Sequence, residues 1–131
     1  MIRCKSVLFV LAIILISILV SSSSKAQITF NEFIIDDSFD AVAIHACDFE
    51  GDEDLDVVAA GIDSGLALWL NEGGYPVQWS RQTIEDDFYG AITIYAIDID
   101  DDGDTDILGG AWYSHEVAWW RNDGGDPVVW T

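Results

Sequence analysis

The residues with the clearest chemical potential are the aspartates of DIDDDGDTDI, a stretch that runs from residue 98 to residue 107. Counted from position 1 at residue 98, acids occupy every odd position up to 9 and Gly103 stands at position 6. These acids are Asp98, Asp100, Asp102, Asp104 and Asp106. Alternating carboxylates around a glycine turn can surround a hard cation with oxygens, in a number that suits Ca²⁺ better than Mg²⁺. An EF-hand needs an acid at position 12, where Gly109 stands, so the stretch predicts a calcium loop of another kind.

A second stretch, DFEGDEDLD, has the same register at an offset of 50 residues toward the N-terminus. Its acids at odd positions are Asp48, Glu50, Asp52, Asp54 and Asp56. Gly51 stands at position 4 and Glu53 occupies the turn position, so we expect a weaker or distorted site here. The simpler alternative is a pair of solvated acidic turns. A shared register favours metal loops, because packed carboxylates repel one another unless a divalent ion neutralises them.

Both loops belong to an internal repeat with a period near 50 residues. Residues 39–61 align with residues 89–111 without a gap, and residues 30–41 match residues 80–91. After one inserted residue, residues 68–80 align with residues 119–131. Such a period is typical of blades or solenoids.

Each period has the pattern of short β-strands. Residues 91–97, 107–112 and 117–121 are apolar runs, and the turn-forming string NDGGDP precedes a fourth run, VVWT. Four antiparallel strands per period predict an all-β fold of β-propeller blades, with a parallel β-helix as the competing architecture. We assign residues 27–38 to a closing strand, 39–88 to blade 1 and 89–131 to an incomplete blade 2. The chain is then expected to be the opening part of a longer protein with a larger ring.

The first 26 residues have the features of a cleaved secretory signal. A basic start and an apolar run over residues 7–20 lead to small residues that place cleavage before Gln27. The run is shorter than the ~20 residues of a membrane span, so we expect export to the extracellular space or cell surface without membrane insertion. All 24 acidic residues follow this segment, where the basic residues are Arg81 and Arg121. This negative charge argues against a nucleic-acid partner.

The pattern D-x-D-x-D-G-x-x-D at residues 98–106, followed by IL and later by WWRNDGG, resembles the FG-GAP/VCBS repeat. That family includes the calcium-binding blades of integrin α-subunit propellers and many secreted bacterial proteins. The resemblance implies a propeller, commonly of seven blades, with calcium in the loop that joins the first two strands of a blade. It implies side-chain ligation at positions 1, 3, 5 and 9 and carbonyl ligation at position 7. The side-chain ligands would be Asp98, Asp100, Asp102 and Asp106 in one loop and Asp48, Glu50, Asp52 and Asp56 in the other, with residues 104 and 54 as carbonyl donors.

Two functions stay open from the sequence. The first is an exported binding or adhesion scaffold with structural calcium, whose partner is an extracellular protein or a glycan. Trp112 and Trp119 have no aromatic counterpart in the first period and could stack on a sugar. The second is a non-catalytic propeller part of an exported enzyme, polysaccharide-active or oxidoreductase, with its active site outside this sequence. No nucleophile and base are paired by the pattern, so we predict no catalytic residue and no cofactor besides calcium.

Overall fold

The computed structural model describes residues 27–131, and the predicted signal segment lies outside the described residues. The chain divides into an N-terminal unit that ends at Phe33 and a second unit from Ile34 to Thr131. Residues 27–38 contain no strand. A closing strand needs another blade to pair with, so this assignment stays a prediction. Within residues 27–131, no helix has the length and apolar character needed to cross a bilayer.

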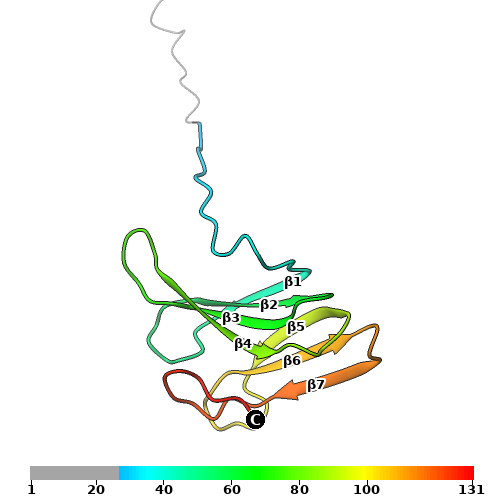
Figure 1. The fold of residues 1–131 in the computed structure, drawn as a ribbon. Coiled ribbons are helices and arrows are strands. Elements are labelled where there is room, and N and C mark those ends of the chain that lie inside the picture. The colour runs from blue at the N-terminus through cyan, green and yellow to red at the C-terminus, as the bar shows by residue number, and fades with distance from the viewer. Residues whose placement is uncertain (1–26) are drawn as a thin grey trace, which may run out of the picture. The chain divides into compact units, whose positions relative to one another are not determined.

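The second unit consists of strands in two antiparallel sheets, which Figure 1 shows. The first sheet, blade 1, has the order β1-β2-β3-β4, and the second, blade 2, has the order β5-β6-β7. Blade 1 contains β1 (Ala43–Cys47), β2 (Asp56–Gly61), β3 (Gly65–Asn71) and β4 (Trp79–Glu85). Blade 2 contains β5 (Ala91–Ile97), β6 (Asp106–Ala111) and β7 (Glu116–Trp120). The predicted all-β fold of partial β-propeller blades is confirmed for the described residues.

Blade 2 also contains the beginning of a fourth strand. Arg121 and Thr131 exchange two backbone hydrogen bonds of 2.9 Å, and Asn122 forms an isolated β-bridge with Trp130. The equivalent pairs in blade 1 join the end of β3 to the start of β4. The NDGGDP string is therefore a turn between strands, as the sequence predicts.

The core lies between the two blades. Successive side chains of a strand point to opposite faces of the sheet, and one apolar face of blade 1 meets one face of blade 2. Blade 1 contributes Val58, Ala60, Leu66, Leu68 and Leu70, blade 2 contributes Ala91, Ile94, Ile107 and Ala111, and Phe88 of the connection between them joins this core. The opposite face of blade 1 carries a smaller cluster of Ala59, Ala67 and Trp69, covered by Phe39 and Trp79. The repeat therefore presents one apolar face of each blade to its neighbour.

The segments that precede the two blades align one residue away from the match of residues 30–41 with residues 80–91. Phe39 packs edge-on against Trp69, with ring centroids 5.1 Å apart, and Phe88 packs in the same way against Trp120 at 4.9 Å. Phe39 thus corresponds to Phe88 and not to Tyr89, so the predicted match of residues 30–41 with residues 80–91 is wrong by one position. A β-bulge near the start of β5 takes up the extra residue.

Candidate metal centre

The second acidic loop brings three of its predicted ligands together. The loop joins β5 to β6, and the pairing of Ile97 with Asp106 fixes both of its ends. Carboxylate oxygens of Asp98, Asp100 and Asp106 all lie within 4.8 Å of one another. Ca²⁺ lies about 2.3–2.6 Å from its oxygen ligands, so two oxygens on one ion are at most about 5 Å apart. The spacing of the three carboxylates therefore fits a shared calcium ion.

Backbone N–H groups hold the first and last of these carboxylates in place. Asp98 accepts hydrogen bonds from the N–H groups of Asp102 at 3.2 Å and Gly103 at 3.0 Å, so the loop turns around this side chain. Asp106 is fully buried and accepts from the N–H groups of Ile99 at 2.9 Å and Asn122 at 2.8 Å. Each carboxylate oxygen can accept more than one hydrogen bond or metal contact, so ligation is compatible with this network.

The remaining two predicted ligands of this loop, Asp102 and Asp104, lie outside the group of three. Oδ1 of Asp102 accepts the N–H of Asp104 at 3.0 Å, and side-chain ligation by Asp102 stays a prediction. The carboxylate of Asp104 lies beside Gly124, where an added Cβ would stand 3.1 Å from its Oδ2. Ligation by the residue 104 carbonyl is compatible with this placement of the side chain and stays a prediction.

The first acidic loop, between β1 and β2, repeats this hydrogen-bonding scheme. Asp48 accepts three backbone N–H groups, Asp52 accepts one and the buried Asp56 accepts two. The donors are Gly51, Asp52 and Glu53 for Asp48, Asp54 for Asp52, and Phe49 and Asn71 for Asp56. Among the described residues, however, the grouping of carboxylates seen in the second loop does not recur in the first. Ligation by Asp48, Glu50, Asp52, Asp54 and Asp56 therefore stays a prediction.

Both loops adopt left-handed backbone conformations at positions 4 and 6. The φ angles are +77° at Gly51 and +74° at Glu53 in the first loop, and +60° at Asp101 and +99° at Gly103 in the second. Each loop thus has glycine at one of two positions that favour it. The sequence pattern identified position 6 as the turn position and missed position 4, which Asp101 occupies in the second loop.

Removal from water raises the pKa of three loop carboxyls, and neighbouring negative charges add to the shift. Removal from water, followed by the charges of Asp102 and Asp106, raises the pKa of Asp100. Removal from water and then nearby acids raise the pKa of Glu50 in the same way. At Asp56 the pKa is also raised, because burial outweighs the two stabilising N–H groups. A divalent cation bound in either loop would compensate the negative charge and lower the pKa values of these carboxyls.

Asn122 is a structural residue that the sequence pattern did not single out. It is fully buried, and its Nδ2 donates to the carbonyls of Phe49 and Thr105, both at 3.1 Å. Phe49 in turn donates its N–H to Asp56 at 2.8 Å. Asn122 thus connects the two acidic loops through hydrogen bonds. The repeated asparagine of NEGG and NDGG was the available signal, but it was interpreted only as part of a turn.

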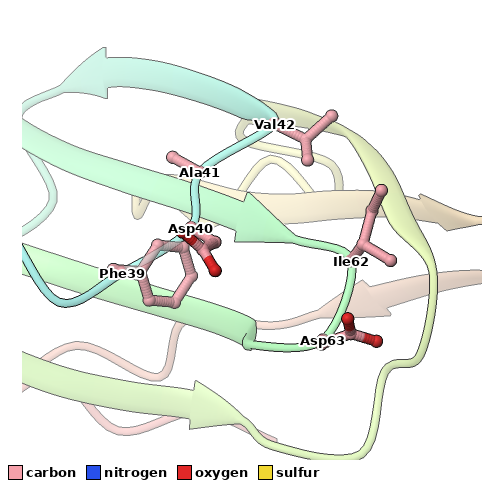
Figure 2. A pocket seen from close by; sticks show the side chains of 6 residues that line it. All are labelled: Phe39, Asp40, Ala41, Val42, Ile62 and Asp63. Carbon is pink, nitrogen blue, oxygen red and sulfur yellow. The ribbon is translucent and has the colours of Figure 1, made fainter.

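A pocket of about 550 Å³ lies at the other end of blade 1. Figure 2 shows its lining residues, which come from the segment before β1 and from the turn between β2 and β3. The polar side chains are Asp40 and Asp63, and no histidine, cysteine or serine accompanies them. The pocket lining therefore has no nucleophile–base pair of the kind that covalent catalysis requires.

The chain is similar to a known repeat family over its two acidic loops. No curated protein matches the chain, and no solved structure matches it. Residues 48–109 match the family described as the FG-GAP-like repeat, from the first acidic loop through the second and into β6. This repeat is a non-catalytic structural unit. Over these residues, which include both acidic loops, the chain is similar to the FG-GAP-like repeat family.

Proposed function

We propose that the chain is a calcium-stabilised β-propeller module of an exported binding or adhesion scaffold. Calcium has a structural role in this proposal, because the acidic loops tie the first two strands of each blade together. The observation that carries the proposal is the grouping of the Asp98, Asp100 and Asp106 carboxylates within 4.8 Å. FG-GAP-like repeats often bind calcium, which supports the choice of ion.

Calcium is favoured over other ions by the chemistry of the donors. The second loop offers carboxylate and carbonyl oxygens and no nitrogen or sulfur ligand. Oxygen ligands are the ones that hard cations prefer. Magnesium demands near-ideal octahedral geometry at about 2.0–2.1 Å, whereas calcium accepts six to eight oxygens in an adaptable arrangement. A nine-residue loop with six aspartates suits the adaptable arrangement better.

Thermal unfolding of the full chain in calcium, in magnesium and in EDTA tests the metal proposal. At a calcium concentration of 100 times Kd, binding to the folded state adds about 2.7 kcal/mol to the free energy of unfolding. For a unit of this size the midpoint should rise by roughly 10–20 °C. Magnesium should give a smaller rise, and Asp98→Asn should reduce the response to calcium. Equal midpoints in calcium and EDTA would eliminate the metal proposal.

Export and adhesion rest on the sequence features of residues 1–26 and on the scaffold character of the repeat. N-terminal sequencing of the chain released by a secreting host tests export, with Gln27 as the expected first residue. A product that stays in the cytoplasm with Met1 intact would contradict it. Binding of the released chain to arrays of glycans and extracellular proteins then tests the scaffold role. Absence of any bound partner would count against adhesion while leaving the metal proposal intact.

A further inference from the structure

A path of hydrogen bonds joins the two acidic loops. It begins at Asp106, the last predicted ligand of the second loop, which accepts the backbone N–H of Asn122 at 2.8 Å. The side-chain Nδ2 of Asn122 donates to the carbonyl of Phe49, in the first loop, at 3.1 Å. Phe49 donates its own N–H to Asp56, the last predicted ligand of the first loop, at 2.8 Å. The path therefore runs from a predicted ligand of one loop to the equivalent ligand of the other.

The side-chain amide of Asn122 has one orientation that satisfies all of its partners. Its Oδ1 accepts the N–H of Gly124 at 2.7 Å. Its Nδ2 donates to the carbonyls of Phe49 and Thr105, one in each acidic loop. A reversed amide would direct its oxygen at two carbonyl oxygens and its NH₂ group at an N–H, so all three bonds would be lost. Because Asn122 is fully buried, such a loss is costly, and the position of its side chain is tied to both loops.

Phe49 also attaches the first loop to blade 2 through its ring. The side chain is 3% exposed and stands edge-on to Trp130 of blade 2, with ring centroids 6.0 Å apart. In the sequence Phe49 lies between Asp48 and Glu50, two predicted ligands of the first loop. A contact that holds the Phe49 backbone therefore acts directly between two ligand positions.

Asn71, the equivalent residue of blade 1, has the same local bonds without the connection to another loop. Its backbone N–H donates to Asp56 at 2.9 Å, and its Oδ1 accepts the N–H of Gly73 at 3.0 Å. Its Nδ2 donates to the carbonyl of Leu55 at 3.3 Å. Within residues 27–131, these side-chain partners of Asn71 all belong to blade 1. The bond to Phe49 is therefore what distinguishes Asn122 from its counterpart in the repeat.

We propose that Asn122 couples the two acidic loops, so that calcium in one loop raises the affinity of the other loop for calcium. This inference rests on the calcium proposal made above and deepens it. Asp106 held by an ion keeps the N–H of Asn122 in place, and Asn122 then keeps the Phe49 carbonyl in place. Part of the ordering that the first loop requires is thereby complete before its own ion binds. The coupling is reciprocal, and such couplings commonly change an affinity by about 5- to 150-fold.

Charge alone would couple the loops in the opposite direction. Two cations repel each other, so an ion in the second loop would lower the affinity of the first loop. That ion adds two positive charges, whereas Asp98→Asn removes one negative charge. Charge alone therefore predicts that the first loop binds calcium more tightly in Asp98→Asn than in the parent chain with a filled second loop. Coupling through Asn122 predicts the opposite order, so the sign of the difference separates the two causes.

Isothermal titration of the full, metal-stripped chain with calcium at about 0.15 M salt, where charge effects between distant sites are screened, measures the coupling. In the parent the first loop is expected to fill in the weaker step, which Asp48→Asn identifies by removing it. In Asp98→Asn the first loop fills alone, and its Kd should be about fivefold or more higher. Asn122→Ala removes the bond to Phe49, so in that background Asp98→Asn should no longer raise this Kd. Asn71→Ala is the matched control, because it removes the equivalent side-chain bonds within blade 1, and the ratio should persist.

A second measurement uses the parent chain and does not depend on the folding of Asn122→Ala. At a calcium concentration that fills the tight site alone, the N–H of Phe49 should exchange with solvent about fivefold or more slowly than in EDTA. The N–H of Val42 is the reference, because it donates to the Ala60 carbonyl at 2.8 Å at the other end of blade 1. A general gain in stability would slow both amides equally, whereas the coupling slows Phe49 more.

Several results would overturn the coupling and leave the calcium site of the second loop intact. These are a first loop that binds no calcium, an equal or lower Kd of the first loop in Asp98→Asn, and the same slowing of exchange at Phe49 and Val42. Persistence of the Kd ratio in Asn122→Ala would also overturn the role of Asn122. Absence of any saturable calcium binding to the parent chain would overturn the calcium proposal together with the coupling.

Discussion

Replacement of Asp106 by asparagine exchanges one carboxylate oxygen for an NH₂ group and keeps the shape of the side chain. The parent side chain is fully buried and accepts the N–H groups of Ile99 at 2.9 Å and Asn122 at 2.8 Å, one on each oxygen. The amide can accept only one of them, so the other buried N–H faces a donor. A hydrogen bond to a charged acceptor contributes about 1.5–3 kcal/mol, and an unpaired buried donor costs about 1–3 kcal/mol. We expect Asp106→Asn to lower the free energy of unfolding by about 2–4 kcal/mol.

Urea unfolding followed by tryptophan fluorescence measures this loss, in EDTA because the effect concerns hydrogen bonds and needs no metal. With a urea dependence of about 1–3 kcal/mol per molar, the midpoint should fall by roughly 1–3 M. Asp100→Asn is the control, because it makes the same charge change in the same loop on an exposed side chain, and it should cause no loss. An unchanged midpoint for Asp106→Asn would refute the inference that these two hydrogen bonds hold the loop.

Two further predictions concern the backbone and the charge of the loops. Glu53→Gly should raise the free energy of unfolding by about 0.5–1 kcal/mol. The reason is that φ is +74° at Glu53, and glycine adopts this left-handed conformation without the energetic cost that other residues have. Glu53→Ala is the control and should bring no such gain. A urea midpoint that falls for Glu53→Gly would contradict this. The raised pKa values of Glu50, Asp56 and Asp100 mean that the folded chain binds protons more tightly than the unfolded chain. In EDTA the free energy of unfolding should therefore rise as the pH falls from 7 to about 5. This range lies above the pKa of about 4 that carboxyls have in the unfolded chain. A urea midpoint that falls over this range would be the contrary result.

Much of the fold could be predicted because the repeat aligns equivalent residues. The apolar run of residues 91–97 became β5 with the same bounds, and the acidic loops fell between the first two strands of each blade. Alternation of apolar residues between turn signals is a local property, so it can be detected without tertiary information. The fourth strand of blade 2 was also detected as far as Thr131.

The features that the sequence did not disclose depend on three-dimensional contacts. The one-residue shift at Phe39 became visible only from its packing against Trp69, because a β-bulge hides an insertion in an otherwise regular alignment. The left-handed conformation of Asp101 follows from how the loop wraps around Asp98, and residue type alone does not report it. The hydrogen bond of Asn122 to the Phe49 carbonyl joins residues that are 73 positions apart.

The central claim, that the second acidic loop binds calcium, is tested most directly by isothermal titration of the full, metal-stripped chain with calcium. The prediction is saturable binding with at least one ion per chain, and loss of the tightest site in Asp98→Asn, whose carboxylate lies at the centre of the loop. Asp48→Asn, the equivalent change in the first loop, should leave that site in place. No saturable heat for the parent chain, or the same tight site in Asp98→Asn, would contradict the account.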